Sequence, residues 1–162
     1  MKNLTLNILL IFWAAVSTAG VPTTQLTETD AIRWDSSLTL PQIDGKPNIG
    51  IAGVFSGRID GKLLIAGGAN FPDRTPAANG EKKYHRDLYI YDTSQGWQII
   101  PDALPAPRAY GVSVTLPEGV LCIGGCNAEE CTNQVLLLTL DGNQPRLTPW
   151  PPLPRPLANA AG

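Results

Sequence analysis

Short apolar runs separated by glycine and proline predict an all-β fold for this chain of 162 residues. Gly occurs 16 times and Pro 15 times, and both lie between the runs rather than in low-complexity tracts. This spacing is typical of many short strands joined by tight turns. A repeated strand pattern and a repeated Trp narrow the prediction to a β-propeller, a disc of four-stranded blades.

The repeat consists of two segments that align from Gly53 and from Gly111. Each segment has a first strand, a turn with glycine, an apolar strand, a diglycine and an asparagine two places on. The diglycines begin at positions 67 and 124, which gives a period of 57 residues. Glycine alone turns with positive φ without a side-chain clash, so the diglycine is expected where a strand ends near the crowded centre of the disc.

Each copy continues with a third strand, a Trp and a Leu-Pro pair. The third strands are predicted at 87–92 and 134–140, and the Trp residues are Trp97 and Trp150. A large aromatic ring fills the wide outer wedge between neighbouring blades. Two copies of the pattern in register predict two successive propeller blades.

The pattern also gives boundaries. Blade one is predicted at 48–105, blade two at 106–154, and the start of a third blade at 155–162. Residues 31–41 contain Trp34 and a Leu-Pro pair with no blade before them. They are interpreted as an outer strand that closes the propeller ring. The chain is therefore expected to be an incomplete N-terminal fragment, and the remaining blades are expected from a longer chain or a partner chain.

The N-terminus predicts a secretory signal peptide over residues 1–19. Lys2 supplies a basic start, residues 4–16 are largely apolar, and Ser-Thr-Ala at 17–19 fits a cleavage site. The apolar stretch is too short to span a bilayer comfortably, and the alternative is a buried N-terminal helix. Cleavage of the signal peptide predicts a periplasmic or secreted protein without a membrane span. The mature chain is expected to begin with a mobile, Thr-rich leader at 20–30.

Composition excludes one class of partner. Twelve Lys and Arg residues stand against fourteen Asp and Glu residues, which gives a net charge of −2. A nucleic-acid partner would require a basic face, so none is expected.

Several stretches resemble bacterial Kelch-repeat proteins related to N-acetylneuraminate epimerase, the sialic acid mutarotase. In blade one they are GGANFP at 67–72 and YHRDLYIYD at 84–92. Blade two resembles the cyclically permuted branch, with PRAYGVS at 107–113, CIGGCN at 122–127 and LPRPLA at 153–158. The resemblance covers residues 34–162 and implies a Kelch-type β-propeller, which is six-bladed in the family.

The resemblance also implies an activity, namely the interconversion of the α and β anomers of free sialic acid. The ring opens by acid–base chemistry, and no cofactor is expected. The Glu and Arg credited with catalysis in the family lie in later blades. No catalytic residue is therefore assigned, and the fragment alone is expected to be inactive. The alternative is a non-catalytic Kelch module that binds a carbohydrate or a protein.

Four residues are predicted to bind the sugar from one face of the disc: Asn70, Phe71, Arg108 and Asn127. The two Asn residues occupy equivalent positions and either bond sugar hydroxyls or stabilise a left-handed turn. Arg108 either holds a carboxylate or is solvated. Phe71 either stacks on a sugar or anchors its own loop. His85, the only histidine, is either an acid–base group or a structural residue.

The three cysteines predict one disulfide in an oxidising compartment. Cys126 and Cys131 bracket a short acidic loop and are the best pair, whereas Cys122 lies within a strand and is expected to be buried and free. A zinc site is the alternative. The sequence has no paired C-x-x-C and no His nearby, which argues against a metal site.

Overall fold

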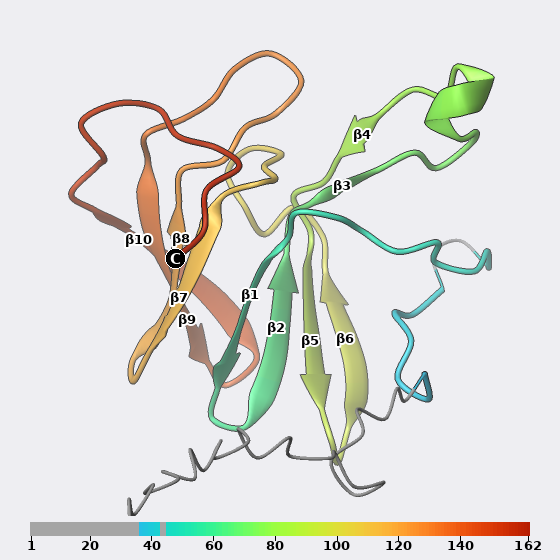
Figure 1. Cartoon of the computed structure of the whole chain (residues 1–162). Coiled ribbons are helices and arrows are strands. Elements are labelled where there is room, and N and C mark those ends of the chain that lie inside the picture. The colour runs from blue at the N-terminus through green and yellow to red at the C-terminus, as the bar shows by residue number, and fades with distance from the viewer. Residues whose placement is uncertain (1–35, 43–44) are drawn as a thin grey trace, which may run out of the picture. The chain divides into compact units, whose positions relative to one another are not determined.

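The computed structural model describes residues 36–42 and 45–162 (Figure 1). Apart from one 3-10 turn, η2 at Pro76–Ala78, every element of these residues is a β-strand, which confirms the predicted all-β class. The strands belong to a compact unit at Ser37–Gly162. Within the described residues, no helix has the length and apolar composition needed to cross a membrane.

Blade one is a four-stranded antiparallel sheet in the order β1-β2-β5-β6. Its strands are β1 at Phe55–Ile59, β2 at Lys62–Ala66, β5 at Leu88–Asp92 and β6 at Gly96–Ile100. Phe55 pairs with Ala66 and Leu64 pairs with Ile90, and all four side chains are buried. Alternation along β1 and β2 places these apolar side chains on a buried face.

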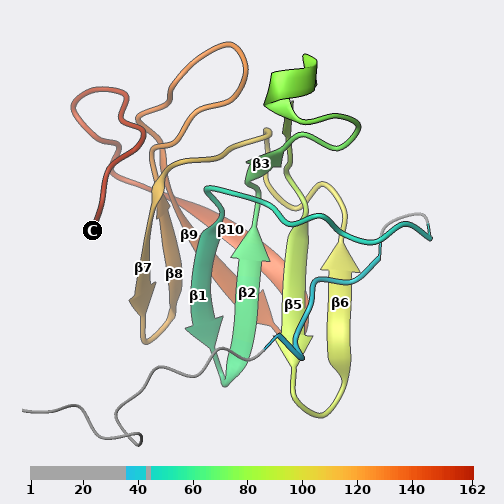
Figure 2. The same cartoon turned by 45° about the vertical axis from the view of Figure 1, so that its right-hand side comes forward.

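Blade two repeats this architecture in the order β7-β8-β9-β10. Its strands are β7 at Val112–Leu116, β8 at Gly119–Ile123, β9 at Val135–Asp141 and β10 at Gln144–Trp150. Pro145 and Pro149 both lie in β10, an edge strand, where a missing N–H is tolerated. A separate pair, β3 at Ala69–Asn70 and β4 at Lys83–Tyr84, rises with η2 beyond the end of blade one (Figures 1 and 2).

The larger of two apolar clusters in the described residues joins the two blades, and β1 contacts both β7 and β8 (Figure 2). Its buried members come from both sheets: Phe55, Ile59, Leu64, Ala66, Leu88, Ile90, Leu104, Val120, Cys122, Leu136 and Leu138. A Cβ atom placed on Gly111 would lie 2.5 Å from the ring of Phe55. At this point the blades therefore lie too close together for any residue that has a Cβ atom.

The diglycines hold successive blades together. All four glycines have positive φ, as predicted: Gly67, Gly68, Gly124 and Gly125. The N–H of Gly68 donates to the carbonyl of Arg108 at 2.8 Å, and the N–H of Gly125 donates to the carbonyl of Leu157 at 2.7 Å. Each diglycine thus bonds to the segment that follows its own blade.

The structure corrects the predicted alignment of the first strands by one residue. The offset of 57 residues that relates the diglycines also relates β1 to β7, so Gly53 corresponds to Tyr110 and not to Gly111. Gly53, Tyr110 and Asn159 have φ values of +64°, +62° and +56°. The N–H of Tyr110 donates to the carbonyl of Gly53, and the N–H of Asn159 donates to the carbonyl of Tyr110, both at 2.8 Å. These bonds link the starts of successive blades.

The strands of the two sheets fall within the predicted ranges 48–105 and 106–154. The predicted signal peptide at 1–19 and leader at 20–30 lie outside the described residues, as does Trp34. Residues 36–41, the described part of the predicted ring-closing strand, are in no strand, and neither are residues 155–162.

Candidate functional site

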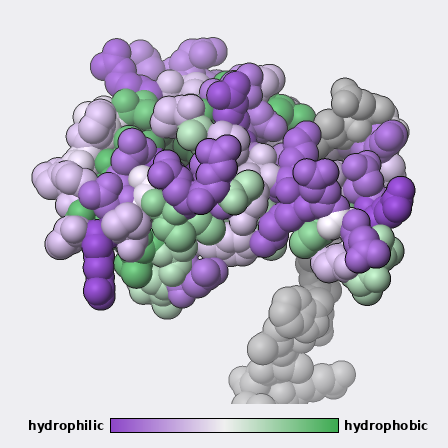
Figure 3. Space-filling view, turned by 90° about the horizontal axis from the view of Figure 1, so that it is seen from above, coloured by the Kyte–Doolittle hydropathy of each residue, from purple (hydrophilic) through white to green (hydrophobic). Residues whose placement is uncertain are grey.

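No single hollow contains all four predicted site residues. Asn70 and Phe71 line a hollow of about 440 Å³ beside β3, whereas Arg108 and Asn127 line one of about 110 Å³ under the loop after β8. No residue lines both. Seen from above, the molecule shows apolar patches among polar and charged side chains (Figure 3). The structure therefore brings these four residues together in pairs and not in a single pocket.

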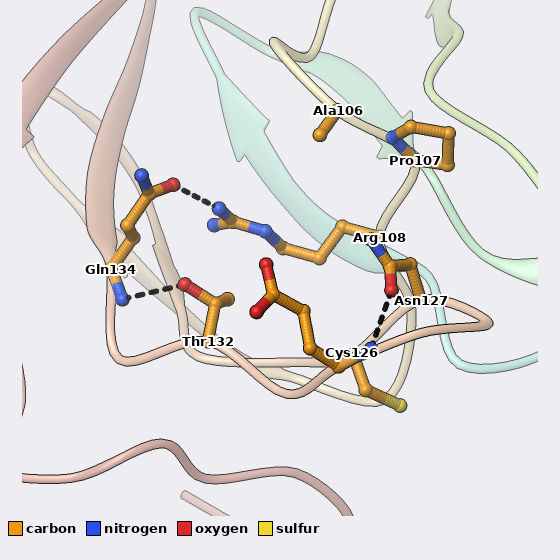
Figure 4. A pocket seen from close by; sticks show the side chains of 8 residues that line it. Ala106, Pro107, Arg108, Cys126, Asn127, Thr132 and Gln134 are labelled. Carbon is orange, nitrogen blue, oxygen red and sulfur yellow. Dashed lines mark hydrogen bonds between the residues drawn. The ribbon is translucent and has the colours of Figure 1, made fainter.

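Arg108 is the one buried charged or polar residue among those described, with 5% of its surface exposed. Its Nη2 donates to the side-chain oxygen of Gln134, and its Nη1 has no hydrogen-bond partner (Figure 4). The only ion pair within the described ranges joins Arg86 to Asp102, so Arg108 has no carboxylate partner there. Burial lowers the pKa of the Arg108 guanidinium, which is the expected response to removing a charge from water. The solvated alternative for Arg108 is wrong.

The backbone around Arg108 fixes this geometry. Its N–H donates to the carbonyl of His85 at 3.0 Å, and its own carbonyl accepts from Gly68. A Cβ atom on Gly125 would lie 2.9 Å from Cγ of Arg108, so glycine at this position leaves room for the stem of the side chain. Figure 4 shows the guanidinium extending across the hollow toward Gln134. Arg108 lines the hollow, and its buried Nη1 lacks a partner, so the side chain is suited to binding an anion that enters there.

Asn127 has a structural role. Its Oδ1 accepts hydrogen bonds from the backbone N–H groups of Glu129 and Glu130 at 2.8 and 2.9 Å. These bonds stabilise the turn from Asn127 to Glu130. Asn127 and Asn70 both lack the positive φ of a left-handed turn, so that alternative is wrong. The role of Asn127 as a ligand to a sugar remains a prediction.

Asn70 connects blade one to His85. Its Nδ2 donates to the carbonyl of Gly50 at 2.9 Å, and its Oδ1 lies 2.9 Å from Nε2 of His85. Because Oδ1 can only accept, Nε2 of His85 carries the hydrogen. Burial, followed by the charge of Lys83, lowers the pKa of His85. A neutral His85 bonded to Asn70 favours the structural interpretation of this histidine.

Phe71 belongs to an aromatic cluster that the sequence did not predict. The Nζ atom of Lys82 lies 4.6 Å from the ring centroid of Tyr110, 5.5 Å from that of Tyr84 and 5.9 Å from that of Phe71. These distances are within the range of cation–π attraction. A one-residue shift in the alignment would have shown that Tyr110 stands where Gly53 stands in blade one.

Cys126 and Cys131 lie directly opposite each other as an isolated antiparallel bridge, and both are free thiols in this structure. The flanking hydrogen bonds, from Asn127 to Glu130 and from Thr132 to Gly125, make the two cysteines a non-hydrogen-bonded pair. Cα atoms of such pairs are about 4.5 Å apart, which is within the range that a disulfide spans. The disulfide thus stays a prediction. No group of three or more metal-ligating side chains gathers within the described ranges.

We expect alkylation to detect this disulfide. Without reductant, the folded protein should take up no label, because Cys126 and Cys131 are bonded and Cys122 is fully buried, with its pKa raised to about 12. Denaturation should then expose one thiol, and reduction should expose all three. The readout is intact mass, and Cys131→Ser is the control. Three labels on the denatured, unreduced protein would contradict the prediction.

Comparisons with known proteins identify relatives. A protein-family model described as N-acetylneuraminate epimerase matches residues 13–147. The N-acetylneuraminate epimerase of Vibrio cholerae is 38% identical over 120 residues, which cover 68% of this chain and 31% of the relative. That of Brucella melitensis is 32% identical over 123 residues, which cover 69% of this chain and 31% of the relative. The chain therefore spans about a third of the length of these curated relatives.

A solved structure, "Structure of YjhT", matches with a TM-score of 0.55 and 28% sequence identity, over 67% of this chain and 33% of that one. Together with the two four-stranded sheets, this likeness confirms the predicted Kelch-type β-propeller, of which the described residues form two blades.

Proposed function

Because the chain belongs to the N-acetylneuraminate epimerase family, as its motifs predicted, we propose that it binds N-acetylneuraminate or a similar acidic sugar for anomer interconversion. The observation that carries the proposal is Arg108, a buried cation with a free N–H and no carboxylate partner within the described ranges. Because Arg108 forms no ion pair within the described ranges and its Nη1 has no partner, a ligand carboxylate would supply hydrogen bonds that the guanidinium lacks.

The hollow at Arg108 measures about 110 Å³ and is partly open to solvent, so a ligand carboxylate can enter it from outside. Thr132 and Gln134, which line the same hollow, supply further polar groups, whereas the carboxylate of Glu130, which also lines it, opposes a second negative charge.

Arg108 is a binding residue in this proposal. Anomer interconversion needs one group that takes the proton of the anomeric hydroxyl and one that protonates the ring oxygen. Neither role is assigned to a described residue. A Kelch module that binds an acidic sugar without chemistry is the second candidate, and it uses Arg108 in the same way. Export of the protein is proposed from the signal-peptide pattern at 1–19.

We expect Arg108→Met to weaken binding of N-acetylneuraminate by about 10- to 100-fold, since hydrogen bonds to charged groups contribute about 1.5–3 kcal/mol. Isothermal titration calorimetry measures the affinity. The free energy of unfolding should not fall, because an apolar residue often replaces a buried charge without loss. The control is Arg86→Met, which removes an exposed Arg. Equal affinities of Arg108→Met and the unmodified protein would contradict the proposal.

A further inference from the structure

A second hollow is built around Tyr110 and shares no lining residue with the one that holds Arg108. A third hollow, lined by Lys82, Pro107 and Asn127 among others, adjoins both. The second hollow measures about 440 Å³, and its lining includes Phe71, Lys82, Tyr110 and the segment 49–52 at the start of blade one. Lys82 lies in the connection between β3 and β4, which stands out beyond the end of the sheet (Figure 2). The hollow therefore combines residues of both blades.

The backbone of Tyr110 is in a conformation that an aromatic residue rarely adopts. Its φ is +62°, and the corresponding residues at the starts of the neighbouring segments are Gly53 and Asn159. Glycine and asparagine are the residues that tolerate this region, whereas a bulky residue there is an outlier. Strain of this kind gathers at functional sites, where the side chain is needed. The fold alone therefore does not explain why a tyrosine occupies position 110.

Neighbouring residues position the Tyr110 ring. A Cβ atom on Gly53 would lie 2.5 Å from Cδ1 of Tyr110, so the absence of a side chain at Gly53 makes room for the ring. Tyr84 packs edge-to-face against it, with centroids 6.4 Å apart and an interplanar angle of 83°. A ring that extends from the start of blade two and is held by residues of blade one presents a preorganised surface to a ligand.

Lys82 supplies a positive charge to the same hollow. It lies over the rings of Tyr110, Tyr84 and Phe71, and it forms no ion pair within the described ranges. Interaction with the Tyr110 hydroxyl raises the pKa of Lys82, so the ammonium stays charged. The hollow thus combines aromatic faces, a phenol and an uncompensated cation.

We propose that this hollow is a second binding site, for a hydroxylated ring compound that carries a negative charge, such as a sugar acid. The apolar face of a sugar ring stacks on Phe71 and Tyr110, the phenol donates to a ring hydroxyl, and Lys82 attracts the negative group. Tyr110 is the residue that determines specificity. In its choice of a sugar acid, this site rests on the proposed function. It shares no lining residue with the Arg108 hollow, so Arg108→Met and Tyr110→Asn test the two sites separately.

The test uses the full chain carrying Arg108→Met, which removes the first site, with N-acetylneuraminate as the probe and ligand-observed NMR as the readout. Binding should persist in this variant and weaken at least about tenfold when Tyr110→Asn is added. Because Asn159 already occupies the equivalent conformation, the Tm should stay within about 4 °C. Unchanged binding after Tyr110→Asn, or no binding to Arg108→Met, would overturn the proposal.

Two further variants separate charge and hydroxyl. Lys82→Gln should weaken binding about tenfold, whereas Lys83→Gln, a neighbour that does not line the hollow, should leave it unchanged. Tyr110→Phe keeps the ring and the fold but removes the hydroxyl, and it should weaken binding about threefold. Equal effects of Lys82→Gln and Lys83→Gln would show a general charge effect and refute a site at Lys82.

Discussion

Replacing Gly67 with alanine is expected to destabilise the protein by about 3 kcal/mol or more. Gly67 has a φ of +65°, and a Cβ atom there would lie 2.3 Å from the carbonyl oxygen of Arg108. That carbonyl belongs to the start of blade two and cannot move without losing its hydrogen bond from Gly68. The free energy of unfolding in urea measures the effect.

Gly142→Ala is the matched control. Gly142 has nearly the same φ, +62°, but a Cβ atom there would have no neighbour within 4 Å. Its replacement should lower the free energy of unfolding by only about 1–2 kcal/mol, which is the strain of alanine in the left-handed conformation. The difference between the two variants isolates the contact between the blades. Equal losses would show that the diglycine is needed only for its own turn.

Replacing Phe55 with alanine should cost about 3–5 kcal/mol. Phe55 is 1% exposed, and its ring packs from β1 against Gly111 at the start of blade two. Because the core is continuous, both blades should lose stability together in one shifted transition. Circular dichroism and Trp fluorescence should report the same midpoint.

Phe71→Ala is the control for this prediction, because Phe71 lies outside the shared core. Its removal should cost less than about 1 kcal/mol, and its main effect should be on ligand binding. A biphasic transition of Phe55→Ala, with one blade unaffected, would contradict a shared core.

The strands of both blades could be predicted because their signals are local. Alternating or continuous apolar runs, ended by Gly67 and by Gly124, fix where each strand stops. The repeat then gave the number of strands in a blade. The alignment of Gly53 with Gly111 failed for a physical reason. A tyrosine occupies a position where glycine is expected, so residue identity misleads, whereas the 57-residue offset of the diglycines and the hydrogen bonds both give the register.

The candidate site was harder to predict. Arg108 could be singled out from its place at the start of blade two, but its burial depends on Gly125 and Gln134, which are distant in sequence. The separation of the four predicted residues into more than one hollow likewise results from loop packing. Nothing in the sequence indicated Lys82 as a site residue, because a lysine in a charged loop is ordinarily solvated.

The central claim is that this chain holds an acidic sugar through its carboxylate. The most direct test compares the affinity of the unmodified protein for N-acetylneuraminate and for its methyl ester, in which the negative charge is removed. The acid should bind at least about tenfold more tightly, because its carboxylate accepts charge-assisted hydrogen bonds from Arg108 and is attracted by Lys82. Equal affinities for the acid and the ester would contradict the account.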